Sequence, residues 1–401
     1  MGTIVSYLEE YGGYNFIEKP LCEIDGLILA HLSYYVYDHV VSGLDERKPA
    51  VTMAYIKGHM DDENFVSVTW EKEVNKELFF KILESRRFRS MKANFYVNEM
   101  DKEQGLQFSA ITFLLGNGDI YLAFRGTDDA LVGWKEDFYM AYRTPVEAQK
   151  RSVEYVEQVE RIFWKRKKAR YYLGGHSKGG NLAAYAAMCC KEKIKHKIGR
   201  VYNFDGPGFR PDFMETLDYV SVQDKMVKFV PKDSCIGMLM QEHDEENAKF
   251  ILIESENIGI AQHVPLSWCV EHDQFVRAES NIPERQDIYD KMNNWLYELE
   301  KEKVGNLIEN IFRMVDATEV ETLTDLRLVS PEMLKRTKTV RNAYREMEEE
   351  TKNSLKEIVG MVIELLAKDQ QERMQKLNIV EKIFGKKEEV RKVGGEQFGN
   401  G

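Results

Sequence analysis

Apolar and polar residues in the middle of the chain alternate as expected for strands and helices in turn. Short apolar runs predict strands at residues 108–115, 120–124, 170–173, 201–204, 226–230 and 250–253, and a Gly-Asn-Gly-Asp turn joins the first two as a hairpin. Longer amphipathic stretches at 146–167 and 181–190 predict helices between them. Strands that alternate with helices favour a mostly parallel central sheet flanked by helices on both faces, which is an α/β fold.

The two ends of the chain have a different pattern. Residues 1–100 are mostly helical, with an apolar face at 24–35 fit for burial. Residues 284 to about 385 lack strand signals and carry a helical apolar repeat, at Leu355, Val359, Val362 and Leu366. We therefore expect a domain over 1–283, divided into an N-terminal part (1–100) and a catalytic core (101–283). A helical C-terminal extension over 284–401, ending in a frayed tail, should follow it.

Composition narrows the class of protein. The net charge of −11 argues against a nucleic-acid partner, because phosphate contacts need a basic surface. No apolar window is long enough for a transmembrane segment, and the N-terminus has no secretory signal. The five cysteines lack C-x-x-C spacing, which disfavours disulfides and a structural metal site. The sequence predicts a reduced, cytoplasmic protein with no metal and no cofactor.

One short motif carries the chemistry. Gly175-His176-Ser177-Lys178-Gly179 lies between a predicted strand and an alanine-rich helix. A serine raised above the end of a strand needs a strained turn, and side chains at the two flanking glycines would collide with the neighbouring strand and helix. The helix N-terminus beneath the serine favours developing negative charge. This context predicts Ser177 as a nucleophile.

The stretch 174–187 resembles the class 3 (fungal-type) lipases of the α/β-hydrolase superfamily. It is still more similar to the bacterial Mbeg1-like family of hydrolases, which carry G-H-S-K-G-G-N-L-A. The resemblance extends over roughly residues 15–280 and leaves out the helical extension. It implies an α/β-hydrolase fold and a serine hydrolase with a catalytic triad.

An acyl-transfer site also needs two N–H donors directed at the developing oxyanion. We expect one from the backbone of Lys178 and the other from Thr127, which follows the strand 120–124. In the lipases that the chain resembles, the residue matching Thr127 donates its N–H and braces the site with its hydroxyl. Trp134 and Asp137 match the W-x-x-D pair that braces this loop in the family. The side chain of Lys178, where the lipases usually have leucine, is assigned no catalytic role.

The general base should be a histidine that follows the serine in the chain. His196 and His243 lie in charged, solvent-like runs, which leaves His263 and His272. We prefer His263, because it precedes a rigid proline turn and matches the family segment Q-H-x-P-x-S-W. The remaining histidines lie ahead of the sheet or beside the serine.

The acid of the triad should follow a strand between the serine and the base, since it holds the imidazole in place. Asp233 fits best, after the strand 226–230. Asp205, after the strand 201–204, is the alternative, either as the acid or as a residue lining the pocket. Asp224 and Asp273 fit less well.

These residues favour a serine esterase that cleaves a carboxylic ester or thioester, with a small-molecule ester or a lipid as substrate. The apolar segment 236–240 could line an acyl pocket or be ordinary core. The alternative is a binding or scaffolding protein, in which the hydrolase body presents its C-terminal helices to a protein partner or to a second copy through residues 284–385.

Overall fold

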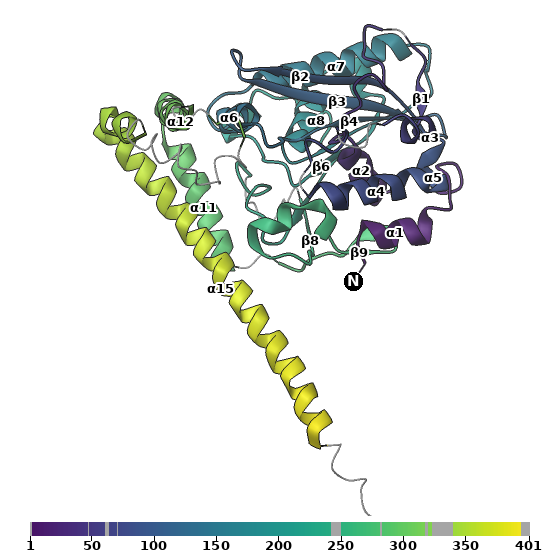
Figure 1. The fold of residues 1–401 in the computed structure, drawn as a ribbon. Coiled ribbons are helices and arrows are strands. Elements are labelled where there is room, and N and C mark those ends of the chain that lie inside the picture. Colours follow the sequence, from purple (N-terminus) through teal and green to yellow (C-terminus); the bar gives the residue numbers. More distant parts are fainter. Residues whose placement is uncertain are drawn as a thin grey trace, which may run out of the picture.

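The computed structural model describes residues 2–46, 48–60, 64–69, 71–241, 250–280, 283–316, 320–322 and 340–393. Its centre is an eight-stranded sheet with the strands in sequence order from β1 to β8 (Figure 1). The strands are β1 Val51–Thr52, β2 Lys92–Asp101, β3 Leu106–Leu114, β4 Ile120–Phe124, β5 Tyr171–His176, β6 Ile198–Phe204, β7 Met226–Pro231 and β8 Ile251–Ile253. The predicted frayed tail lies outside the described residues.

The sheet has two halves. Strands β1 to β4 pair antiparallel, and β4 to β8 pair parallel. The predicted sheet with helices on both faces is therefore confirmed, with an antiparallel half added at the N-terminal edge. Parallel strands end at the same edge of the sheet, so the loops that follow β4, β5, β6 and β7 gather there.

Alternation along the strands separates two cores. In β4, Ile120, Leu122 and Phe124 face one core, while Tyr121 and Ala123 face the other, as the period of two in a strand requires. The first core packs against α7 and α8, and the second against α1, α2 and α4, on the opposite side of the sheet (Figure 1).

Three helices of the body, α2, α7 and α8, lie close to the predicted stretches 24–35, 146–167 and 181–190. The helices of the body are α1 Ile4–Tyr11, α2 Glu23–Leu32, α3 Met53–Lys57, α4 Lys72–Glu84, α5 Arg86–Arg89, α6 Leu131–Tyr139, α7 Glu147–Phe163, α8 Lys178–Cys189, α9 Glu192–Lys195 and α10 Pro211–Met214. Two 3-10 turns, η1 Gly259–His263 and η2 Pro265–Ser267, and a small hairpin, β9 Val270–Glu271 with β10 Gln274–Phe275, follow β8.

After the hairpin, the described residues include three long helices: α11 Pro283–Glu298, α12 Lys301–Asp316 and α15 Glu349–Val393. Part of α15 packs on α11 and α12, and its far end projects beyond the body (Figure 1). None of the described helices has both the length and the apolar stretch needed to cross a bilayer.

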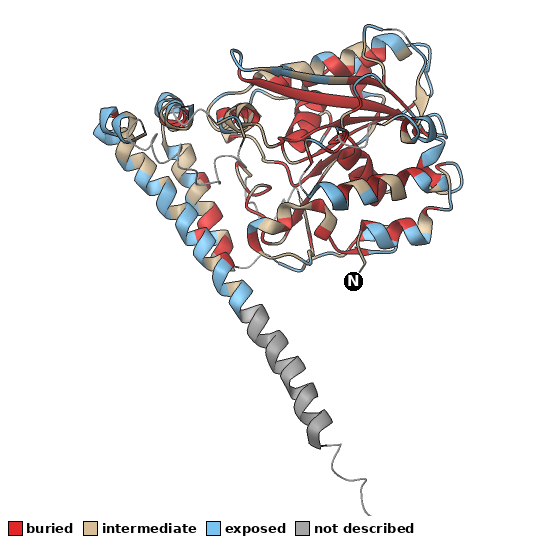
Figure 2. Ribbon diagram, in the orientation of Figure 1, coloured by how far each residue is buried: buried red, intermediate tan, exposed pale blue. Residues whose placement is uncertain are grey.

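The apolar repeat of α15 faces solvent. Val359, Val362 and Leu366 are 45%, 41% and 50% exposed, whereas Leu365 is buried against α11 (Figure 2). The helix therefore uses another face for packing, and the exposed repeat is the surface on which the partner-binding hypothesis depends.

Candidate active site

Ser177 occupies a strained turn between β5 and α8. Its φ of +58° and ψ of −134° are unusual for a residue with a side chain. The backbone holds this conformation from both sides, because Ser177 N–H donates to the Phe204 carbonyl at 2.9 Å and the Ser177 carbonyl accepts from Gly180 N–H at 2.9 Å. Ser177 thus lies above the carboxyl end of β5, in the position expected of a nucleophile in this motif.

The flanking glycines are required by space. A Cβ on Gly175 would lie 2.3 Å from the Gly179 backbone, and a Cβ on Gly179 would lie 2.1 Å from the Phe124 carbonyl oxygen. Any side chain here would therefore push α8 away from β4 and β5. The expected steric reason for both glycines is confirmed.

The imidazole of His263 is paired with Asp205. His263 Nδ1 lies 2.6 Å from Asp205 Oδ2, and the carboxylate is fully buried. The same oxygen accepts the Ser234 hydroxyl at 2.5 Å. The structure thus pairs His263 with Asp205, which was the alternative acid in the sequence analysis, and not with the preferred Asp233.

Asp233 lies beside this pair and holds a different residue. Its Oδ2 accepts from the Gln262 side-chain amide at 2.7 Å, and its own N–H donates to the Gln262 side-chain oxygen at 3.1 Å. The Tyr289 hydroxyl donates to its carbonyl at 2.8 Å. The expectation for Asp233 is corrected on geometry: its carboxylate binds the neighbour of His263, because the loop after β7 turns it toward α11.

The other candidates lie elsewhere. His272 is 71% exposed in its side chain and lies 3.1 Å from Glu10. Asp273 pairs with Lys19 at 2.7 Å, and Asp224 is exposed at the start of β7. These residues are therefore not part of the group around Ser177.

A second histidine, His176, is hydrogen-bonded to the backbone of His263. His176 Nε2 donates to the His263 carbonyl oxygen at 2.8 Å, and the two rings are 4.5 Å apart. Its Nδ1 then accepts the Tyr34 hydroxyl, at 3.1 Å. Burial holds the pKa of His176 well below its usual value, so the ring is neutral and this tautomer can persist. The sequence did not identify this role, because Tyr34 lies 142 positions away.

The loop after β4 lies directly against the nucleophile turn. A Cβ on Gly126 would be 3.0 Å from the Ser177 Cβ and 2.6 Å from the His176 carbonyl oxygen. The next residue, Thr127, donates its hydroxyl to Asp137 Oδ2 at 2.5 Å. Lys178 is the first residue of α8, so its N–H has no acceptor within the helix. The loop that carries Thr127 and the first residue of α8 therefore both border Ser177.

Trp134 and Asp128 fix the same loop. Trp134 Nε1 donates to the Asp128 carbonyl at 3.1 Å, and the Asp128 carboxylate pairs with Arg125 at 3.3 Å and accepts from the Gln107 amide. The loop is thus tied to α6 and to β3. Arg125, Gln107 and Asp128 were not singled out in the sequence, because nothing local marks them as partners.

The Lys178 side chain is buried behind the oxyanion loop. Its Nζ lies 3.1 Å from Glu136 Oε2, donates to the Gln107 carbonyl at 3.1 Å, and is 3.7 Å from Asp137 Oδ1. Glu136 also accepts the backbone N–H groups of Gln107 and Ala148, at 3.0 and 2.8 Å. An ion pair that is this fully hydrogen-bonded can be kept inside a protein.

Asp137 makes stability depend on pH. Burial raises the pKa of its carboxyl to about 6, against the opposing effects of the Lys178 ammonium and the Thr127 hydroxyl. Because the pKa of Asp137 is higher in the folded state than in the unfolded state, the folded state binds this proton more tightly. The contribution of Asp137 to the free energy of unfolding is therefore largest at low pH and is lost as the pH rises through 6. Asp137→Asn should remove the dependence while still accepting the Thr127 hydroxyl.

We expect Asp137→Asn to raise the free energy of unfolding at pH 7.5, relative to wild type, by about 1–2 kcal/mol. At pH 4.5 the two proteins should be nearly equal in stability. Urea unfolding at both pH values measures this difference, and an identical difference at the two pH values would contradict the assignment.

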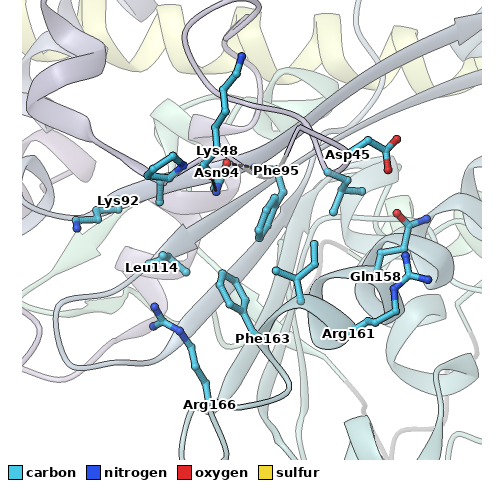
Figure 3. Close-up of a pocket in the computed structure, with 14 residues that line it drawn as sticks. Asp45, Lys48, Lys92, Asn94, Phe95, Leu114, Gln158, Arg161, Phe163 and Arg166 are labelled. Atoms are coloured by element: carbon cyan, nitrogen blue, oxygen red, sulfur yellow. Dashed lines mark hydrogen bonds between the residues drawn. The ribbon is translucent and has the colours of Figure 1, made fainter.

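A pocket of about 940 Å³ lies away from these residues, between the loop at 44–50, the strands β2 and β3, and the end of α7 (Figure 3). Lys48, Lys92, Arg161 and Arg166 line it, and all four are exposed. None of the residues around Ser177 lines this pocket, so it is separate from the candidate active site.

Comparisons with solved structures find proteins of low sequence identity. A fungal lipase structure is 10% identical over 75% of this chain and 98% of its own, with a TM-score of 0.37. The protein MDLA from Penicillium cyclopium is 10% identical over 63% of this chain and 84% of its own, with a TM-score of 0.36. Comparison with curated proteins gives no match.

The topology of the sheet, with a serine turn between β5 and α8, is that of an α/β-hydrolase. The profile of the Mbeg1-like family matches residues 82–313, which is more than half of the chain. The protein therefore belongs to the Mbeg1-like family.

Proposed function

We propose that the protein is a serine hydrolase that cleaves a carboxylic ester or thioester. Ser177 is the nucleophile, His263 the general base, and Asp205 the carboxylate that orients it; the N–H groups of Thr127 and Lys178 hold the oxyanion. The single observation that carries the proposal is the 2.6 Å contact between His263 and a fully buried carboxylate, beside a serine on a strained turn.

The reaction follows from these roles. His263 Nε2 takes the proton of Ser177 Oγ as the oxygen attacks the carbonyl carbon, and the carbonyl oxygen becomes an oxyanion held by the two N–H groups. When this intermediate collapses, the imidazolium returns the proton to the leaving alcohol or thiol, and an acyl-enzyme remains. Water, deprotonated by the same imidazole, then releases the acid and restores Ser177.

The Asp205 carboxylate has two tasks in this cycle. It keeps the proton on Nδ1, so that Nε2 faces the serine as an acceptor, and it offsets the positive charge of the imidazolium. Among the described residues Ser177 Oγ has no hydrogen bond, so Nε2 has to approach it by side-chain rotation when substrate binds. Such contacts often tighten only in the substrate complex.

The acyl side of the substrate is left open in this proposal. Met238 and Met240, in the apolar segment 236–240, are 2% and 5% exposed and belong to the packed cores. These two side chains therefore belong to the core, and the substrate class is defined by the ester or thioester bond alone.

Ser177→Ala should lower kcat for a short p-nitrophenyl ester by about 10³- to 10⁶-fold, since no other group can form the acyl-enzyme. Ser221→Ala serves as the matched control, because Ser221 is bonded to Asp218 in a turn ahead of β7. The control should keep wild-type kcat. Equal activity in wild type and Ser177→Ala would exclude the proposal.

A further inference from the structure

The C-terminal helix α15 reaches the turn that carries His263. Asp369 Oδ2 accepts the N–H of Ile260 at 3.0 Å, and Ile260 lies in η1, which ends at His263. Asp369 is only 4% exposed, although it belongs to a helix that is otherwise largely exposed (Figure 2). A carboxylate from α15 therefore caps the turn that presents the imidazole.

The turn is shaped to receive this carboxylate. Gly259, the first residue of η1, has a φ of +59°, and a Cβ built there would lie 2.1 to 2.3 Å from the three carboxyl atoms of Asp369. Only glycine combines this conformation with so close an approach.

A buried guanidinium connects the helix to the same turn by a second route. Arg285, on α11, is fully buried and forms ion pairs with Asp369 at 2.7 Å and with Glu372 at 3.0 Å. Its Nε is 4.0 Å from Asp233 Oδ1, and Asp233 in turn binds Gln262. The two routes from α15 thus reach Ile260 and Gln262, on the N-terminal side of His263.

These contacts couple the position of α15 to the position of His263. A guanidinium buried without its carboxylates is strongly unfavourable, so α11 and the turn are stable as placed only while Asp369 and Glu372 are docked. Small displacements of a catalytic group are enough to slow a reaction by one or two orders of magnitude.

We propose that α15 is a clamp that keeps the active site assembled, with Asp369 and Glu372 as positioning residues for His263. This inference rests on the proposed function, because the helix α15 would control the proposed active site at Ser177 and His263. When α15 is docked, the imidazole is held against Asp205; when the helix detaches, η1 loses its cap and the imidazole leaves its place. The state of the C-terminal helix thereby sets the hydrolase activity.

The test uses the full-length double variant Asp369→Asn/Glu372→Gln, which removes both charges and keeps the side-chain shapes. We expect kcat to fall about 10- to 100-fold with KM within about twofold. Backbone hydrogen exchange should become faster in 259–263 and stay unchanged in β5 and α8. Glu372→Gln alone leaves the Ile260 contact in place, should act in the same direction more weakly, and replaces the double variant if that one does not fold.

The matched control is Glu364→Gln, on the same helix, where the carboxylate is half exposed and 4.0 Å from Lys291. It should change neither kcat nor exchange. Unchanged exchange in 259–263 of the double variant, or faster exchange spread evenly over β5 and α8, would overturn the clamp. If wild type hydrolyses no ester, the proposed function fails, and the exchange of 259–263 still decides whether α15 holds the turn.

Discussion

Replacing Asp205 by Asn should lower kcat/KM for ester hydrolysis by about 10³- to 10⁴-fold. The amide keeps the size of the carboxylate, but it can present its N–H group to His263 Nδ1, so that Nδ1 becomes the acceptor. The imidazole would then adopt the tautomer with its proton on Nε2, which cannot accept the Ser177 proton. No charge would remain to offset the imidazolium.

The comparison with Asp233→Asn makes this prediction specific. Asp233 is also a buried carboxylate after a parallel strand, but it binds Gln262 instead of the imidazole. Asp233→Asn keeps an oxygen for that amide, so we expect kcat/KM to stay within about tenfold of wild type. Steady-state kinetics of both variants measures the contrast, and a larger loss in Asp233→Asn than in Asp205→Asn would reverse the assignment of the acid.

Lys178→Met should lower the free energy of unfolding by about 3–5 kcal/mol, because it leaves a buried carboxylate without its cation. Glu136 is fully buried, and Lys178 is 1% exposed in its side chain. The two N–H groups that Glu136 also accepts cannot replace the lost charge. Urea unfolding at pH 7 measures the change.

Lys150→Met is the matched control for this variant. Lys150 pairs with Glu147 at 2.6 Å, but its side chain is 48% exposed, so the loss should be no more than about 0.5 kcal/mol. A loss below about 1 kcal/mol in Lys178→Met would show that the buried pair contributes no more than a surface pair does.

The centre of the fold was predictable because its signals are local. The strand at 120–124, the turn at 116–119 and the strand–turn–helix context of the serine motif each depend on residues that are adjacent in sequence, and all three are confirmed. The strand β2, at Lys92–Asp101, was not predicted. It contains a register shift between Asn94 and Val97 and is stabilised by pairing with β3, so its own sequence carries only a weak alternation.

The acid of the proposed triad could not be identified from local sequence. Asp205 and Asp233 both follow strands of the parallel half, and strand position alone cannot rank them. Two facts of the folded chain decide the contact: Asp205 has a φ of +53°, and β6 lies directly beside β5, the strand of Ser177.

The contacts of α15 could not be predicted for a related reason. Asp369 is 109 positions from Ile260, and the apolar repeat of the helix did not decide between packing on the body and association with another helix. A single buried carboxylate in a charged helix has no sequence signature, because its partner, Arg285, comes from a separate helix.

Labelling with a fluorophosphonate probe, followed by mass-spectrometric mapping of the modified peptide, tests the central claim most directly. We predict a single adduct on Ser177 in wild type and none in Ser177→Ala. An adduct on any other residue of the wild-type protein, or persistent labelling of Ser177→Ala, would contradict the account.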